Sequence, residues 1–145
     1  MLNHALAGIV FISAASISFA QMTPVGTWQT LDDKTKEVKS EVQITEAAGV
    51  LSGKVVKLLR KDAKQDVVCD ECTDDRKGKP VLGMEIIRSV KKVDGKDVWE
   101  DGKVLDPENG KTYSARLTPI EGGRKLEMRG SIGLFGRTQT WVRVQ

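Results

Sequence analysis

The segment DGKVLDPENGKTYSARL, residues 101–117, contains two runs of β-forming residues separated by Asp-Pro-Glu-Asn-Gly. Asn109-Gly110 can adopt the positive φ values that a tight hairpin turn demands. The segment therefore predicts two antiparallel strands, over residues 97–105 and 111–118, joined by a short turn.

The same pattern recurs along most of the chain, with a strand-forming run about every 10 to 14 residues. Asp94-Gly95 and Gly122-Gly123 supply further turns. Residues 50–59 carry apolar side chains on both faces, so a single helical turn is the alternative there. The eight predicted strands cover residues 25–30, 38–45, 50–59, 83–93, 97–105, 111–118, 124–131 and 137–144.

Eight consecutive antiparallel strands, with almost no amphipathic helix to cover them, leave two sheet edges to be hidden. Closure into a barrel removes both edges. The expected fold is all-β, an eight-stranded antiparallel up-and-down barrel, and a β-sandwich is the alternative. A barrel of this size is either filled by its own side chains or holds one small ligand.

Residues 1–20 have the features of a signal peptide cleaved after Ala20. No charged side chain precedes Asp32, and an apolar run over residues 5–17 ends in Ser18-Phe19-Ala20. The run is short for a membrane span, and a retained anchor is the alternative. Residues 21–145 are then a single domain with no membrane span, exported to the periplasm or secreted.

Charge and composition limit the classes of function. A net charge of +3 with interspersed signs and 5% aromatic residues argue against a nucleic-acid partner. The single histidine, His4, lies in the predicted signal peptide, so no Ser-His-Asp relay is expected. An enzyme is not expected, and neither is a cofactor. A hydrolase using carboxylates, either Asp32 with Asp33 or a set of Asp101, Asp106 and Glu108, is the alternative, but Asp32-Asp33 and residues 106–110 lie in turn-forming sequence.

Cys69 and Cys72 are the only cysteines. In an oxidising compartment a disulfide is the default, and it would pin the long polar connection over residues 60–80. A redox centre is disfavoured because acidic neighbours oppose the thiolate. A metal site would need carboxylates such as Asp70, Asp74 and Asp75 to complete the ligand set, and no metal is expected.

Gly26-Thr27-Trp28 resembles the G-x-W signature on the first strand of lipocalins and related calycins. The resemblance implies that Trp28 plugs one end of the barrel. It also implies that a basic side chain of the last strand, Arg137 or Arg143, lies across its ring. An ordinary core tryptophan is the alternative reading.

Longer motifs resemble a family of exported bacterial proteins known as domain of unknown function two-one-four-seven. They are GTWQTLDD, GKPVLGMEII, DGKVLDPENGKTYSARL and RGSIGLFGRTQTW, which together span nearly the whole of residues 21–145. The chain departs from the family at Lys36, where glycine is usual, so the turn after Asp33 is expected to differ. The resemblance implies a calycin-like barrel and an exported address, without an established reaction.

These observations favour a binding protein whose ligand is a small apolar or amphipathic molecule. Met84, Tyr113 and Met128 are candidates for lining its site, with plain core packing as the alternative. A structural or interaction protein of the cell envelope, with a filled barrel, is the competing class, and its protein partners cannot be named. Around Gly130, Gly133 and Gly136 we expect a bend or bulge. The tip at residues 134–135 is expected to pack back on the end of the barrel, and an exposed apolar contact for a ligand or a membrane is the alternative.

Overall fold

The computed structural model describes residues 22–144. The predicted signal peptide lies outside this range. Within it, the eight strands are β1 (Gly26–Leu31), β2 (Val38–Ala47), β3 (Val50–Leu58), β4 (Glu85–Lys92), β5 (Trp99–Asp106), β6 (Lys111–Ile120), β7 (Lys125–Ile132) and β8 (Phe135–Arg143). A short 3-10 helix, η1 (Glu121–Gly123), joins β6 to β7. None of the helical structure in these residues is long and apolar enough to cross a bilayer.

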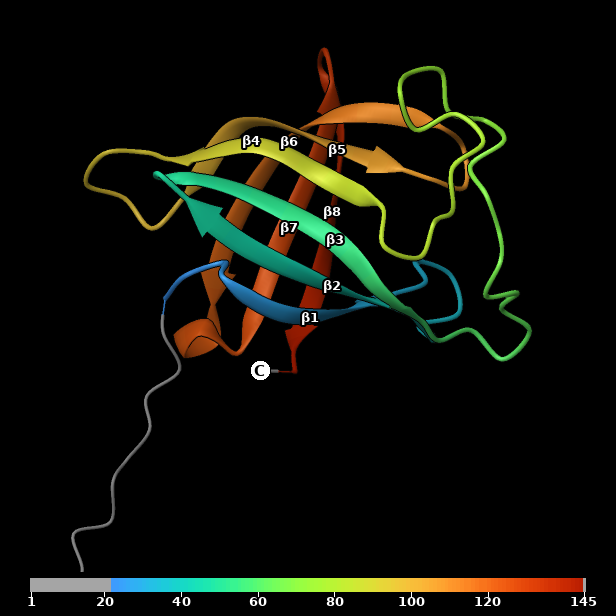
Figure 1. The fold of residues 1–145 in the computed structure, drawn as a ribbon. Coiled ribbons are helices and arrows are strands. Elements are labelled where there is room, and N and C mark those ends of the chain that lie inside the picture. Colours follow the sequence, from blue (N-terminus) through green and yellow to red (C-terminus); the bar gives the residue numbers. More distant parts are fainter. Residues whose placement is uncertain (1–21, 145) are drawn as a thin grey trace, which may run out of the picture.

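The strands form a closed antiparallel barrel in which each strand pairs with the next along the chain (Figure 1). Closure is made between β1 and β8, where Trp28 faces Arg143 and Gln29 faces Val142. The predicted up-and-down barrel is therefore confirmed, and the sandwich alternative is wrong. Closure brings the two sheet edges together, although only Val142 and Arg143 of β8 pair with β1.

Glycines at the predicted turns adopt left-handed backbone conformations. Gly95, Gly110 and Gly122 have φ values of 72°, 71° and 66°. The β2–β3 turn, which the sequence did not single out, is built by Ala48 and Gly49 at φ 51° and 78°. Each turn lets the chain reverse within a few residues, and this keeps consecutive strands in contact.

Residues 50–58 form a strand throughout, and the alternative of a helical turn is wrong. The register between β2 and β3 shifts after the Val42–Val55 pair, so that Glu41 faces Lys57. Val55 is buried inside the barrel while Val56 is 37% exposed on the outside. The apolar residues on both faces, which blurred the sequence pattern, are thus the result of an irregularity in a strand.

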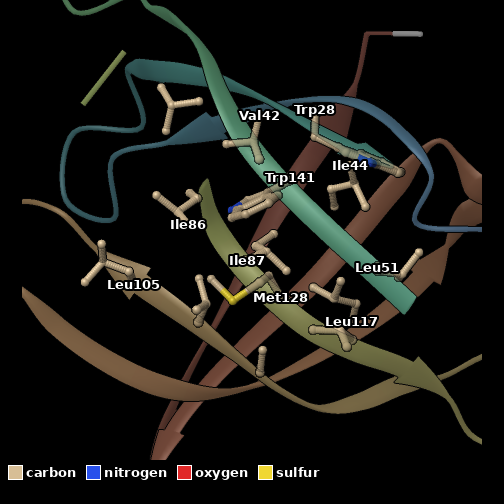
Figure 2. Packing of buried hydrophobic residues seen from close by; sticks show 14 of the residues in the cluster. Trp28, Val42, Ile44, Leu51, Ile86, Ile87, Leu105, Leu117, Met128 and Trp141 are labelled. Atoms are coloured by element: carbon tan, nitrogen blue, oxygen red, sulfur yellow. The ribbon is translucent and has the colours of Figure 1, made fainter. Parts of the chain in front are cut away.

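The core fills the part of the barrel around Trp28. Figure 2 shows apolar side chains from several strands gathered inside the barrel. Core residues that are at most 1% exposed include Ile44, Leu51, Ile87, Leu117 and Leu126. Burying such side chains contributes about 1.5–3 kcal/mol each before conformational entropy is subtracted. This half of the barrel is a packed core.

Candidate functional site

Successive connections in an up-and-down barrel alternate between its two ends, so the two ends carry different loops. Four connections lie at one end: β1–β2, β3–β4, β5–β6 and β7–β8. The β2–β3, β4–β5 and β6–β7 turns lie at the other, together with the start of β1 and the end of β8. We call the second the Trp28 end and the first the mouth.

At the Trp28 end, the indole is completely buried and its polar atom is satisfied. Trp28 is 0% exposed, and its Nε1 donates to the carbonyl oxygen of Pro24 at 2.7 Å. The guanidinium carbon of Arg143 lies 4.2 Å from the centroid of the indole ring. A cation over an aromatic face at this distance contributes about 0.5–2 kcal/mol.

Arg143 also donates hydrogen bonds to three backbone carbonyls around the indole. Its Nε donates to Gly123 at 2.6 Å, Nη1 to Val25 at 2.8 Å and Nη2 to Thr23 at 2.6 Å. Burial lowers the pKa of Arg143. One side chain therefore ties together the segment before β1, the β6–β7 connection and β8.

Of the two arginines considered from the sequence, Arg137 lies at the opposite end of β8. Its Nη1 is 3.0 Å from Oδ2 of Asp33, and 63% of its side chain is exposed. Arg137 and Arg143 are an even number of residues apart, so they share the inward face of β8 but lie at its two ends. Arg137 belongs to the mouth.

The mouth half of the barrel contains a cavity of about 880 Å³. This lies within the 300–1,000 Å³ that is typical of small-molecule sites. Its wall is mainly apolar, formed by Val55, Leu58, Ile86, Val104, Leu105, Met128 and Trp141 among others. Its rim is charged, with both signs represented by Lys39, Arg60, Asp62, Lys64, Asp70, Glu71, Asp106, Glu108 and Arg137.

Trp141 presents the indole that lines the cavity, and a chain of hydrogen bonds leads from it to the rim. Its Nε1 donates to Oε1 of Gln139 at 3.1 Å. Nε2 of Gln139 donates to Oδ2 of Asp33 at 3.2 Å, the same oxygen that Arg137 contacts. Polar groups beside the apolar wall are therefore partnered, as buried polar groups must be.

Ion pairs connect three segments across the rim. Nη2 of Arg60 lies 2.9 Å from Asp32 Oδ2 and 2.9 Å from Glu108 Oε1. Lys39 Nζ is 3.3 Å from the same oxygen of Glu108. Backbone N–H groups of Thr35 and Lys34, and then Arg60, hold the pKa of Asp32 well below its usual range. The carboxylates here serve the turns and ion pairs of the rim.

The predicted disulfide between Cys69 and Cys72 is confirmed, with a Cα–Cα distance of 5.5 Å. Both residues are buried, at 0% and 1% exposure. Cys69 N donates to the Lys79 carbonyl at 2.9 Å, and Gly78 N donates to the Cys69 carbonyl at 2.8 Å. The bridge therefore anchors a compact fold within the connection between β3 and β4.

This connection packs closely on the β5–β6 turn. A Cβ at Gly110 would collide with the carbonyl of Glu71 and the amide of Cys72, and Gly110 also has a φ of 71°. Glycine is needed here for both reasons. Residues from the same connection, including Ala63, Val67 and Val81, line the cavity, so the disulfide loop forms part of its wall.

Two arginines tie the acidic residues beside the disulfide to the barrel. The Arg76 side chain donates to Asp74, and its Nη1 donates to the carbonyl of Glu85 at 2.8 Å. The hydrogen bonds that Asp74 accepts from the side chain and the backbone amide of Arg76 lower its pKa to about 2. Arg88 holds Asp75 with two hydrogen bonds of 3.0 Å. Residues 22–144 contain no cluster of three or more candidate ligands for a metal ion.

The carboxylates considered for hydrolysis cap turns. Asp32 Oδ1 accepts from the amides of Lys34 and Thr35 at 2.9 Å. Asp106 Oδ1 accepts from the amide of Glu108 at 2.9 Å. Such hydrogen bonds are what Asp supplies in a tight turn.

The three candidate lining residues have different positions. Tyr113 and Met128 are among the residues around the cavity, and the Tyr113 hydroxyl accepts a hydrogen bond from Asn109 at 3.0 Å. Met84 is not among them; it is 6% exposed and packs in the core. It lies in the connection before β4, where the alternation of a strand does not yet fix the direction of a side chain.

Sequence reasoning missed Trp141, Gln139 and Arg60 as cavity residues. Trp141 and Gln139 carried a usable signal, because they alternate with Arg143 along β8 and so share its inward face. Arg60 carried none, since it begins a connection without periodicity.

The comparisons with known proteins agree with this geometry. A solved structure, protein HP1028 from Helicobacter pylori, described as belonging to the lipocalin family, superposes with a TM-score of 0.71. It is 22% identical, and the match covers 87% of this chain and 84% of that one, so the likeness shows a shared fold. A search of curated proteins found no match.

The family resemblance drawn from the sequence motifs is confirmed over almost all of the barrel. Residues 26–143 match the family described as "Uncharacterized protein conserved in bacteria (DUF2147)". With its lipocalin-like barrel, the chain belongs to this DUF2147 family.

Proposed function

We propose that the protein is an exported carrier that binds one small apolar or amphipathic molecule in the cavity. The observation that supports this most directly is the cavity itself, which has an apolar wall and a charged rim. An apolar portion of a ligand would lie against Trp141 and Met128. A polar portion would remain at the rim, near Arg60 and Arg137, as is usual for sites with few polar contacts.

We propose that the Trp28 end of the barrel is closed to the ligand. Trp28 and Arg143 close one end through burial and through hydrogen bonds to three carbonyls. A ligand would then enter and leave by the mouth alone. The disulfide between Cys69 and Cys72 supports export, because such bonds persist in oxidising compartments.

The proposal favours binding over catalysis. Asp32 and Asp106 accept backbone hydrogen bonds within their own turns. Carboxylates that hold turns in this way favour a structural role over that of the acid or base in glycoside hydrolysis.

Titration with N-phenyl-1-naphthylamine, a neutral apolar fluorophore, tests the proposal on residues 21–145. We expect saturable one-to-one binding, and competition by long-chain fatty acids or lysophospholipids. Met128→Trp, which places a larger side chain in the cavity, should weaken binding about tenfold or more. The matched control is Val142→Trp on the outer face of β8, which should bind as the unaltered protein does.

Native mass spectrometry of gently purified protein gives an independent measure, since a retained ligand adds a defined mass. If neither the fluorophore nor any apolar compound binds, and no mass is retained, the carrier proposal fails. An envelope protein that acts through its surface would then be the better description.

A further inference from the structure

The tip of the β7–β8 hairpin carries the most exposed large apolar side chains of residues 22–144. Leu134 is 99% exposed, Phe135 84% and Ile132 53%. Figure 1 shows this tip projecting beyond the neighbouring strands. Single apolar residues on a surface are ordinary, whereas several gathered at one projecting tip mark a contact site. The expectation that residues 134–135 pack back on the barrel is wrong.

The fold does not require these side chains at the tip. Ile132 and Phe135 are paired, so Gly133 and Leu134 form a two-residue turn. Gly133 supplies the positive φ, 58°, that such a turn needs at its first position. The second position accepts polar residues equally well, so turn chemistry does not explain Leu134.

The glycines around the tip do not create the bend or bulge that was expected. Pairing between β7 and β8 is regular from Lys125 to Ile132. A Cβ at Gly136 would instead lie 2.5 Å from Nη2 of Arg129, so this glycine leaves room for the guanidinium to lie along the hairpin. Nη1 of Arg129 donates to the Thr138 hydroxyl at 3.4 Å.

The surface near the tip is positively charged. Residues 128–139 and β6 together contain no Asp or Glu. Their cations are Lys111, Arg116, Arg129 and Arg137. Arg116 is paired with Glu100 and Arg137 with Asp33, whereas the contact made by Arg129 is to a hydroxyl. The apolar tip is therefore flanked by Arg129, which makes no ion pair within residues 22–144, although Glu127 lies two residues farther from the tip on the same face of β7.

We propose that this hairpin tip docks on the surface of a bilayer that contains anionic phospholipid. Leu134 and Phe135 would enter the interfacial region while Arg129 meets lipid phosphates, a combination of apolar burial and charge attraction that holds proteins at membranes. The tip is a projecting hairpin with no groove of its own (Figure 1), which suits the surface of a bilayer. β8 pairs with β1 only at Val142 and Arg143, so strand addition along residues 135–141 is the protein contact that would compete with this proposal.

Docking at this point would bring the cavity to the bilayer. Ile132 and Phe135 also lie at the rim of the cavity, so the mouth would face the lipid surface. Leu134 does not line the cavity, which allows docking to be tested without altering the proposed ligand site.

The experiment is flotation of residues 21–145, which contain the whole barrel and omit the apolar N-terminal segment. The vesicles contain three parts phosphatidylethanolamine to one part phosphatidylglycerol, and pure phosphatidylcholine vesicles serve for comparison. We expect binding to the anionic vesicles that weakens as salt is raised. Leu134→Ser should reduce the partition coefficient about tenfold. Arg129→Gln should reduce it about fivefold and flatten the salt dependence.

Val142→Ser is the matched control, because Val142 is 37% exposed on the outer face of β8 at the Trp28 end, away from the tip. It should leave partitioning unchanged, and near-ultraviolet circular dichroism should show all variants folded. Absence of vesicle binding, or equal binding by the Leu134 variant, overturns the proposal. A concentration-dependent dimer that Leu134→Ser dissociates, without vesicle binding, would identify self-association instead. The Leu134→Ser variant should still bind N-phenyl-1-naphthylamine. Loss of vesicle binding with fluorophore binding retained would therefore concern docking alone and leave the carrier proposal untouched.

Discussion

The two ends of the barrel are built from the same eight strands but differ in what their interiors contain. Around Trp28 the indole is fully buried, and Arg143 donates to three carbonyls. Around Trp141 the strands enclose a cavity of about 880 Å³ with a charged rim. The difference indicates that stability is concentrated at one end, which leaves the other free to hold an open space.

Replacing the tryptophan at either end, in two separate variants, should give the largest change in the free energy of unfolding. Trp28→Ala should lower the free energy of unfolding by about 3–5 kcal/mol, because a packed site cannot collapse around the loss. Trp141 is itself only 2% exposed but is among the residues around the cavity, so Trp141→Ala should enlarge an existing space and cost less than Trp28→Ala. Urea denaturation followed by circular dichroism measures both.

Equal losses for the two variants would contradict the comparison, because they would mean that the cavity half is packed as tightly as the Trp28 end. Trp141→Ala should also weaken binding of N-phenyl-1-naphthylamine. Trp28→Ala should leave the affinity of the remaining folded protein unchanged.

The disulfide provides an effect of intermediate size at the mouth. Replacing both Cys69 and Cys72 with Ala should lower the free energy of unfolding by about 2 kcal/mol, because the loop that they close is short. Hydrogen exchange should accelerate in residues 66–80 and remain slow in β1 and β8. Reductant added to the unaltered protein is the control and should give the same exchange pattern. Equal acceleration at the Trp28 end would show that the two ends are not independent.

Sequence was sufficient for the barrel because its signals are local. The alternation of apolar and polar side chains identifies a strand from a few consecutive residues. Turn residues such as Asn109-Gly110 then show that two neighbouring strands pair with each other. The disulfide could be predicted because the chain has only two cysteines and export to an oxidising compartment was expected. The cavity did not follow, because its wall includes residues from the connection before Met84, which has no repeating pattern. Whether an interior is filled depends on how side chains distant in the sequence pack together, and Trp141 and Tyr113, on different strands, both border the cavity.

Lys36 gives the smallest expected effect and tests the departure from the family pattern. It has a φ of 62°, a conformation that glycine adopts without cost. Lys36→Gly should therefore raise the free energy of unfolding by up to about 1 kcal/mol. The control is Lys34→Gly in the same loop, where φ is not positive, and it should lower stability by a few tenths to about 1 kcal/mol. A loss at both positions would mean that the β1–β2 loop carries no backbone strain.

The carboxylates that fasten the mouth have a consequence for acid conditions. Hydrogen bonds to Thr35, Arg76 and Arg88 lower the pKa values of Asp32, Asp74 and Asp75 respectively. A carboxyl whose pKa is lower in the folded state contributes stability above its unfolded value, near 4, and loses it only as the pH falls further. The carboxylates of Asp32, Asp74 and Asp75 therefore remain charged in mildly acidic surroundings. The shape of the mouth should accordingly be the same at pH 5 as at neutral pH.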